Sequence, residues 1–262
     1  MNELETTGHR GHEAIIQSFR TRPAVRFIPF IMGGDPTLEA TEKHIHALAR
    51  LGATVIEIGV PYSDPLADGP VIQEAALRAL QAGTTVRGLF DLVRRVRAAG
   101  VTVPIVFLVY VNTVLRYGIQ AFFNEARAAG VEGLMIPDLS WEESAPFREA
   151  EEATGIALIP LVTLTSRHRL PYLLKDRTGF VYVVSSLGVT GTREELDKRL
   201  VSYLTEVRKN TDLPVAVGFG ISQKEHIETL SPHADAVIIG SHLVSHLAAG
   251  GSIDDWYKTL FA

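Results

Sequence analysis

Three groups of residues in this sequence have types and spacing that could do chemistry, and the first is an acid inside an apolar segment. Glu57 lies in the run Val-Ile-Glu-Ile-Gly, between Ile56 and Ile58. If its two neighbours face helices, its own side chain faces the interior of the fold. A carboxylate there is costly unless it is hydrogen-bonded, protonated or catalytic. Glu57 is therefore either a structural residue that caps a neighbouring loop or a general acid and base with a raised pKa.

The loop after this segment carries two more carboxylates. It reads Val-Pro-Tyr-Ser-Asp-Pro-Leu-Ala-Asp-Gly-Pro from Val60 to Pro70, and its prolines stiffen it. Asp64 precedes a proline, which predicts an ordinary turn. Asp68 lies just before the next predicted helix, so it is either the N-cap of that helix or a functional acid. The spacing does not choose between these two interpretations.

The third group is a set of glycines that follow the last three apolar segments of the chain. They lie in Gly188-Val189-Thr190-Gly191, in Gly218-Phe219-Gly220-Ile221-Ser222 and in Gly240-Ser241. Glycine lets backbone N–H groups approach an anion closely, and a helix N-terminus adds its positive end. One Gly-X-Gly would indicate only a turn. Three such sites at consecutive strand ends predict a phosphate-binding site.

These groups need a scaffold, and the sequence predicts one of alternating strands and helices. Eight short apolar segments are nearly continuous rather than alternating, which is typical of parallel strands covered on both faces. They are Arg26–Ile31, Thr54–Ile58, Val103–Leu108, Gly133–Ile136, Ala157–Pro160, Phe180–Val184, Pro214–Val217 and Asp235–Ile239. Between them, apolar residues return every three or four positions, as in helices. The segment Arg-Ala-Ala-Gly-Val occurs at 97–101 and again at 127–131, where its glycine would end a helix.

Eight such units with no dividing linker favour the α/β class, as one closed (β/α)₈ TIM barrel rather than a doubly wound open sheet. The length of 262 residues suits one such barrel, so we expect a single domain over residues 1–262. We expect extra helices at the N-terminus, after the second strand at Pro70–Gln81, and at the C-terminus at Ser252–Leu260. Residues 1–14 are expected to form a mobile N-terminus.

The composition excludes several classes of function. The chain has no cysteine, which removes disulfides, thiol nucleophiles and cysteine-ligated metals. Its net charge of −5 gives no basic field to hold nucleic acid. The start, Met1–Gly11, is unlike a secretory leader, and the longest apolar run, Val103–Val111, is too short to cross a membrane. We therefore expect a cytoplasmic protein that binds neither nucleic acid nor membrane.

The histidines offer no convincing metal site. His242 and His246 lie four residues apart on a predicted helix, a spacing that could hold a metal. No acid or cysteine joins them, so the interpretation we favour is an ordinary helix face. We expect no bound metal.

Several motifs resemble those of the tryptophan synthase alpha chain family. The most specific is Ile-Glu-Ile-Gly-Val-Pro-Tyr-Ser-Asp-Pro-Leu-Ala-Asp-Gly-Pro-Val-Ile-Gln, from Ile56 to Gln73. The supporting motifs lie in the same order along the chain, at Pro29–Pro36, Leu108–Asn112, Ile136–Leu139, Ser185–Gly191 and Gly218–Ser222. The resemblance extends over nearly the whole chain from about Phe19 onward.

This resemblance implies a lyase of tryptophan biosynthesis that cleaves indole-3-glycerol phosphate, by a retro-aldol reaction, to indole and glyceraldehyde 3-phosphate. It implies that Glu57 is the catalytic acid and base and that Asp68 is the second catalytic carboxylate. It also implies substrate-binding roles for Phe30, Tyr182 and Thr190, and phosphate-binding roles for Gly191, Gly220, Gly240 and Ser241. No metal or organic cofactor is implied for this chain.

The resemblance further implies a partner, a beta chain that holds pyridoxal phosphate and consumes the indole in a tetramer of two alpha and two beta chains. Three positions depart from the family pattern. Met32 stands where Thr is common, Thr113 where Pro is common, and Ser140-Trp141 where Pro often follows Asp-Leu. Their strand-end loops resemble those that face the beta chain, so these departures bear on partner affinity.

Three alternatives remain at this stage. The chain could act as a stand-alone lyase that releases free indole, or as a barrel that has lost catalysis and only activates its partner. The presence of both Glu57 and Asp68 argues against the second of these. The chain could also be another phosphosugar enzyme of the barrel fold, with the same phosphate site and a different base.

Overall fold

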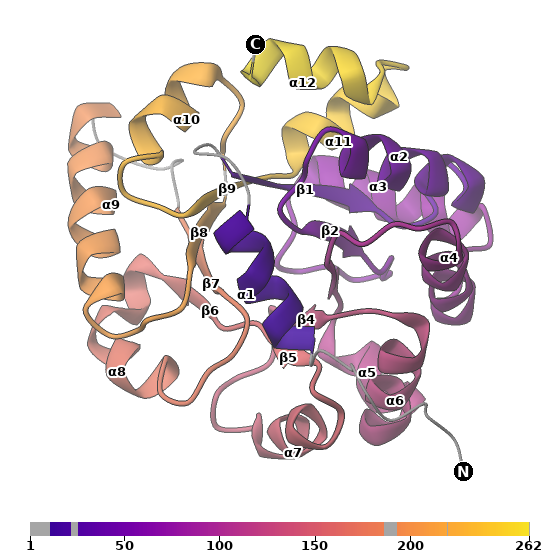
Figure 1. Cartoon of the computed structure of the whole chain (residues 1–262), viewed down its shortest axis with the longest axis horizontal. Coiled ribbons are helices and arrows are strands. Elements are labelled where there is room, and N and C mark those ends of the chain that lie inside the picture. Colours follow the sequence, from indigo (N-terminus) through magenta and orange to yellow (C-terminus); the bar gives the residue numbers. More distant parts are fainter. Residues whose placement is uncertain (1–10, 22–25, 186–192, 219, 262) are drawn as a thin grey trace.

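The computed structural model describes residues 11–21, 26–185, 193–218 and 220–261, with the backbone alone described over 193–198. Its centre is a parallel sheet that curls into a barrel (Figure 1). The strands are β1 (Phe27–Met32), β2 (Ile56–Gly59), β3 (Ile105–Leu108), β4 (Gly133–Met135), β5 (Ala157–Leu158), β6 (Leu161–Thr163), β7 (Val181–Val184), β8 (Val215–Gly218) and β9 (Ala236–Ile239). Eight of them overlap the eight predicted segments, and β6 is an additional strand that begins directly after the predicted segment Ala157–Pro160.

The barrel closes through the segment that runs from β5 to β6. The strand order is β5-β4-β3-β2-β1-β9-β8-β7-β6, so the two ends of the sheet are neighbours in the sequence, joined by Ile159 and Pro160. The Ile159 N–H donates to the Leu134 carbonyl at 2.9 Å, and the Tyr182 N–H donates to the Pro160 carbonyl at 2.9 Å. The segment therefore pairs with β4 on one side and β7 on the other. The predicted (β/α)₈ barrel is confirmed, with eight strand positions.

Helices cover the outside of the barrel. They are α1 (Gly11–Thr21), α2 (Leu38–Arg50), α3 (Pro70–Gln81), α4 (Val86–Ala98), α5 (Val111–Tyr117), α6 (Ile119–Ala129), α7 (Ala145–Thr154), the 3₁₀ helix η1 (Leu164–Arg169), α8 (Leu170–Leu173), α9 (Arg193–Arg208), α10 (Lys224–Leu230), α11 (Ser241–Ala248) and α12 (Ile253–Phe261). The extra helix α3 has the predicted bounds, and α12 begins and ends one residue later than predicted. Within the described ranges, no helix is long and apolar enough to cross a membrane.

Alternation along the strands separates two packed layers. Ile56 and Ile58 belong to the large cluster between sheet and helices, whereas Phe30 and Tyr182 belong to the cluster inside the barrel. Glu57, between the two isoleucines, therefore points inward, as the sequence predicted. The barrel interior is an apolar compartment, and Glu57 places a carboxyl group within it.

Helix α1 crosses the N-terminal end of the barrel, in the middle of the view in Figure 1. Its Ile15 and Phe19 belong to the interior cluster, and the Phe19 ring lies 5.7 Å from that of Phe180. Residues 11–14 of the expected mobile segment lie in this helix, and residues 1–10 lie outside the described part of the chain. The N-terminal extra helix thus closes one end of the barrel.

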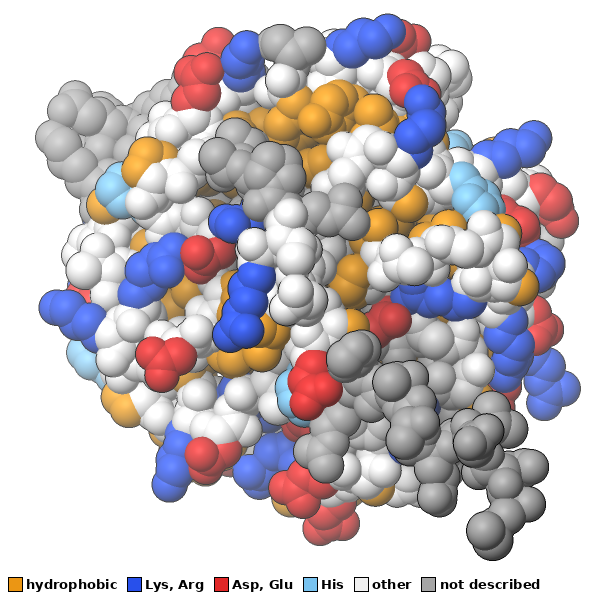
Figure 2. Space-filling model, viewed as in Figure 1, with side chains coloured by type: hydrophobic (Ala, Val, Ile, Leu, Met, Phe, Trp, Pro, Cys, Tyr) orange, Lys and Arg blue, Asp and Glu red, His pale blue; other side chains and the backbone are white. Residues whose placement is uncertain are grey.

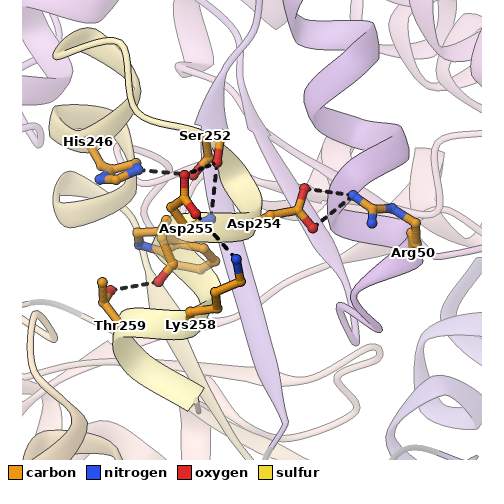
Figure 3. Close-up of polar contacts among 8 residues, drawn as sticks. Arg50, His246, Ser252, Asp254, Asp255, Lys258 and Thr259 are labelled. Atoms are coloured by element: carbon orange, nitrogen blue, oxygen red, sulfur yellow. Dashed lines mark hydrogen bonds and ion pairs between the residues drawn. The ribbon is translucent and has the colours of Figure 1, made fainter.

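The two histidines that are four residues apart both contact the C-terminal helix. The His246 ring donates to the Ser252 carbonyl at 3.0 Å, just before α12 begins (Figure 3). The Trp256 indole N–H donates to Nδ1 of His242 at 3.1 Å. Within the described ranges, no group of three or more His, Cys, Asp or Glu residues could hold a metal ion. The contacts therefore support a structural role in docking α12 on α11.

The two Arg-Ala-Ala-Gly-Val segments are joined to each other by an arginine. Arg97, in the first, donates to the carbonyl of Gly130, in the second, at 2.8 and 3.0 Å. It also pairs with Glu132 at 2.6 Å, and that carboxylate accepts the Ile105 N–H at 2.7 Å. One buried cation thus fixes the end of α6 and the start of β3.

We expect Arg97→Met to lower the free energy of unfolding by about 3 kcal/mol, because it strands the Glu132 carboxylate in a site where both side chains are less than a fifth exposed. Arg94→Met is the matched control. Arg94 pairs with Asp91 and with Glu125, and all three side chains are at least 35% exposed, so its loss should cost much less than the loss of Arg97. Urea unfolding of both variants measures the difference. Equal losses of unfolding free energy in the two variants would show that burying the Arg97–Glu132 pair adds no stability.

Candidate active site

Glu57 is a buried carboxyl group without a partner. It lies on β2 inside the barrel, is 2% exposed, and aligns in register with Phe30 of β1 and Val106 of β3. Among the described residues, neither of its carboxyl oxygens has a hydrogen-bond partner. The described residues therefore give no support to the interpretation of Glu57 as a loop cap. Burial, reinforced by the nearby Asp68 carboxylate, raises the pKa of Glu57 to about 8, so the carboxyl is mostly protonated at neutral pH.

Asp68 faces the same region from the loop between β2 and α3. The N-cap of α3 is Gly69, and no side chain caps this end of the helix. The N-cap interpretation of Asp68 is therefore wrong. Its carboxylate instead accepts a hydrogen bond from the Tyr110 hydroxyl at 3.0 Å. Burial raises the pKa of Asp68, and the Tyr110 hydrogen bond opposes that rise.

Tyr110 is a site residue that the sequence analysis did not single out. Its hydroxyl also accepts the Ala67 N–H at 3.1 Å, so it holds both the side chain and the backbone of the Asp68 loop. Its ring stacks on that of Tyr62, with centroids 5.1 Å apart. A signal was present, because Tyr110 lies in the Leu108–Asn112 motif, two residues beyond the inward-facing Leu108. Spacing alone does not show which acid its hydroxyl would reach.

Tyr182 and Phe30 complete the wall around the two acids. Tyr182 lies on β7 inside the barrel, and burial, followed by the charges of Glu57 and Asp68, raises its pKa well above the ordinary tyrosine value. A Cβ on Gly218 would lie 2.7 Å from the Tyr182 hydroxyl, so β8 must end in glycine here. Phe30 is the register partner of Glu57. The structure thus brings Phe30 and Tyr182 to the same part of the barrel as the two acids.

The two described glycines of the predicted phosphate site, Gly220 and Gly240, lie at the same edge of the barrel. In the β8–β9 pair Gly218 lies opposite Ile238, so Gly220 and Gly240 follow the two strands at the same edge. Gly240 is the N-cap of α11, with no side-chain cap, and Ser241 is the first residue of that helix. The helix therefore presents its N-terminal N–H groups at this edge. Thr190 and Gly191, also predicted to bind substrate and phosphate, lie outside the described residues.

Two of the positions that depart from the family pattern pack within the chain. Met32 is 5% exposed and belongs to the interior cluster, where its methyl group would lie 3.0 Å from a Cβ on Gly59. It is the last residue of β1, so it forms part of the barrel wall rather than a loop. The Trp141 ring is contacted by the guanidinium groups of Arg148 at 4.5 Å and Arg177 at 4.3 Å. These contacts give both residues an intramolecular role.

The fold and the site together define a class of protein. The fold is a closed (β/α)₈ barrel. Glu57, Asp68 and the N-terminus of α11 lie toward the carboxyl ends of its strands, which is where enzymes of this fold carry their active sites. A buried acid with a pKa near neutrality is suited to proton transfer. The molecule therefore has the architecture of a barrel enzyme, with two acids and the N-terminus of α11 at the end of the barrel where such enzymes react.

Comparison with known proteins assigns the family. The family model described as tryptophan synthase alpha chain matches residues 16–257, and the chain belongs to this family. A curated relative of that name from Geobacillus sp. (strain WCH70) is 48% identical over 84% of both chains. One from Lacticaseibacillus casei is 46% identical over 85% of this chain and 83% of its own. The family cleaves indole-3-glycerol phosphate, so the chain is a carbon–carbon lyase of tryptophan biosynthesis.

Solved structures agree with this assignment. Tryptophan synthase subunit alpha from Campylobacter jejuni has a TM-score of 0.84 and 33% identity, covering 92% of this chain and 96% of its own. A chain of tryptophan synthase from M. tuberculosis in its aminoacrylate-bound form has a TM-score of 0.81 and 33% identity, covering 90% of this chain and 92% of its own. The barrel of this chain is thus similar to that of the family's solved members.

We expect the Glu57 carboxyl of the folded protein to titrate near pH 8. This titration should be absent from the Glu57→Gln variant. Nuclear magnetic resonance of ¹³C-labelled glutamate side chains measures it. In Asp68→Asn the pKa should fall but stay above 4.5, because burial, its larger cause, remains. A wild-type value near 4.5 would contradict the assignment.

The same shift predicts how stability depends on pH. Because the folded-state pKa is raised above 4.5, the stability linked to Glu57 is complete below pH 4.5 and is lost as the pH rises through about 8. The wild type should therefore lose stability relative to Glu57→Gln over this range.

Proposed function

We propose that Glu57 moves both protons of the retro-aldol cleavage of indole-3-glycerol phosphate. Its protonated carboxyl delivers a proton to the ring carbon that bears the side chain, and the carboxylate so formed removes the proton from the hydroxyl on the adjoining carbon. The carbon–carbon bond then breaks, its electrons return to the indole ring, and the aldehyde of glyceraldehyde 3-phosphate forms. The observation that carries this proposal is that Glu57 is buried, has no hydrogen-bond partner among the described residues, and has a pKa of about 8.

Asp68 supplies the negative charge that stabilises the positive charge formed on the indole ring. Protonation of the ring makes its nitrogen cationic, and an ionised Asp68 that accepts the indole N–H stabilises this cation as it develops. The Tyr110 hydrogen bond favours the ionised form of Asp68 and sets the direction of its carboxylate. Tyr110 thus acts as a positioning residue through Asp68.

The remaining predicted residues bind the substrate at its two ends. Phe30 and Tyr182, with Thr190 by its place in the family motif, line the indole side. Gly220, Gly240 and Ser241, with Gly191 by the same argument, hold the phosphate through backbone N–H groups. Binding energy from the remote phosphate orients the bond that breaks.

We expect Glu57→Gln to lower kcat for indole-3-glycerol phosphate cleavage by roughly 10²- to 10⁴-fold, because the amide keeps the shape but exchanges no proton. Asp68→Asn should lower kcat more than it weakens binding, because it loses charge in the transition state. Asp64→Asn is the control and should leave kcat nearly unchanged, because Asp64 lies on the same loop and its side chain accepts a hydrogen bond from the neighbouring Ser63 hydroxyl. Near-normal turnover in folded Glu57→Gln would overturn the proposal.

The phosphate site is best tested at Ser241. Gly220 has a φ of 78°, so any side chain there strains the loop whether or not phosphate binds. Ser241→Asp instead puts a negative charge at the start of α11, which favours the helix but repels phosphate. We expect this variant to raise KM about tenfold or more, whereas the uncharged Ser241→Asn changes it much less. If both variants behave alike in steady-state assays, the phosphate lies elsewhere.

We also propose that a beta chain holding pyridoxal phosphate docks beside the ends of β2 and β3, forming a tetramer of two alpha and two beta chains in the cytoplasm. A cavity of about 420 Å³ there is lined by Tyr62 and Thr113. Leu66 and Leu115, on the elements that line it, are 94% and 53% exposed. Large exposed apolar side chains beside a functional loop favour a protein partner. Thr113 is thus the departure from the family pattern that lies at this surface.

Indole release with and without an added beta chain separates the complex from a stand-alone lyase. We expect Leu66→Asp and Leu115→Asp to weaken activation by the beta chain while leaving the basal rate of the isolated chain intact. Leu77→Asp, on the outer surface of α3 and 55% exposed, is the control. If the beta chain changes neither the rate nor the sedimentation of the wild type, the partner assignment fails.

A further inference from the structure

Helices α11 and α12 form a hairpin that two hydrogen bonds hold together. Near the turn, the His246 ring donates to the Ser252 carbonyl at 3.0 Å (Figure 3). Further from the turn, the Trp256 indole N–H donates to Nδ1 of His242 at 3.1 Å. The Ser252 carbonyl also accepts the Trp256 backbone N–H at 3.0 Å. His242 and His246 are four residues apart, as are Ser252 and Trp256, so the two bonds connect neighbouring turns of the hairpin.

The bond from Trp256 is buried and requires one form of His242. Trp256 is 0% exposed, and its ring lies 6.2 Å from that of Phe27, the first residue of β1. An indole N–H can only donate, so Nδ1 of His242 must be unprotonated. Burial, and then the charge of His246, lowers the pKa of His242, which favours the neutral ring. The bond therefore ties His242 to a side chain that is itself packed on the barrel.

His242 also belongs to the start of α11. The Val244 N–H donates to the Gly240 carbonyl at 3.0 Å, which closes the first turn of this helix. The N–H groups of residues 241–243 precede that bond, so the helix itself gives them no acceptor. The proposed function places the phosphate at this edge. His242 thus offers its backbone N–H to the anion while Trp256 holds its side chain.

Such local donors matter because the chain as a whole is acidic, with a net charge of −5. On the face seen in Figure 2, which is the end of the barrel crossed by α1, Lys and Arg side chains are interspersed with Asp and Glu side chains. Salt also weakens the attraction between an anion and separate surface charges. The direction in which the first turn of α11 points its N–H groups should therefore influence phosphate affinity directly.

We propose that Trp256 is a positioning residue for the substrate phosphate and that it acts through His242. Its indole N–H fixes the first turn of α11, so that the backbone N–H groups of residues 241–243 converge on the anion. The inference rests on the proposed function, because it requires the phosphate to lie at this helix start. Trp256 is fully buried and does not touch the substrate, so it contributes to binding and not to bond cleavage. Helix α12 is thus part of the support of the phosphate site.

Steady-state kinetics, at a pH above the ordinary histidine pKa, test the proposal. We expect Trp256→Phe to raise KM for indole-3-glycerol phosphate roughly threefold to tenfold and to leave kcat within about twofold, because a hydrogen bond that aligns a remote group affects substrate and transition state alike. His242→Phe, which removes the acceptor, should do the same. In the double variant the rise in KM should not exceed that of the weaker-binding single variant, because both changes remove one bond.

His246→Phe is the matched control. It removes the other hydrogen bond of the hairpin, at the end far from the phosphate edge. It should therefore lower the free energy of unfolding, measured in urea, while KM changes by less than about twofold. Equal rises of KM in His242→Phe and His246→Phe would show that α12 has a merely structural role, and would overturn the proposal.

Titration with glycerol 3-phosphate, followed by the indole N–H resonances, gives a readout that stability alone would not change. The chain has two tryptophans, so the Trp256 resonance is the one absent from Trp256→Phe. We expect it to shift saturably in the wild type but not in Ser241→Asp, and sodium chloride at equal ionic strength should not reproduce the shift. The resonance of Trp141, which precedes α7 on the other side of the barrel from α11, should stay in place (Figure 1).

The outcomes separate this inference from the proposed function. If Ser241→Asp raises KM and Ser241→Asn does not, but Trp256→Phe and His242→Phe leave KM unchanged, the phosphate site stands and the inference fails. If the two Ser241 variants behave alike, both fail. If Trp256→Phe does not fold, the comparison of His242→Phe with His246→Phe decides.

Discussion

The burial of the Glu57 carboxyl, with no hydrogen-bond partner in the part of the chain that the structure describes, is the constraint on which the rest of the candidate site depends. An ionised carboxylate in an apolar compartment is far more costly than a protonated one, so the barrel interior keeps the proton on Glu57 at neutral pH. Asp68 adds to this effect. Burial raises the pKa of Asp68 as well, and the hydrogen bond from Tyr110 opposes that rise. The surroundings of the two acids therefore differ, because Tyr110 donates to Asp68 and no described residue donates to Glu57.

The barrel makes this difference possible. Closure through the segment that contains Pro160 brings β7 and β8 round to face β2, so that Tyr182 shares the interior with Glu57. At the other end, α1 inserts Ile15 and Phe19 into the interior, which helps to keep that compartment apolar. The site is therefore a property of the closed fold rather than of the loops alone.

Much of this arrangement could be predicted from the sequence. Continuous apolar runs gave all eight strand positions, and the inward direction of Glu57 followed from its two isoleucine neighbours. What spacing could not decide was whether Asp68 caps α3, because an acid before Gly-Pro fits both roles. The choice depends on Tyr110, which is 42 residues away in the sequence.

The same limit explains the other differences. The family pattern places Met32 beside partner-facing loops, but Met32 is the last residue of β1 and its side chain packs inside the barrel. The predicted strand Ala157–Pro160 contains β5 but stops before β6, because β6 is defined by its pairing with β7, and only the closed sheet determines that pairing.

The pH dependence of kcat/KM for indole-3-glycerol phosphate cleavage tests the central claim most directly, because it reports the ionisation of the free enzyme's essential groups. If the protonated form of Glu57 starts the reaction, kcat/KM should fall as the pH rises through about 8. That limb should move to lower pH in Asp68→Asn, because one cause of the raised pKa is then removed. A rate that stays level through pH 8, or a limb that does not move, would contradict the account.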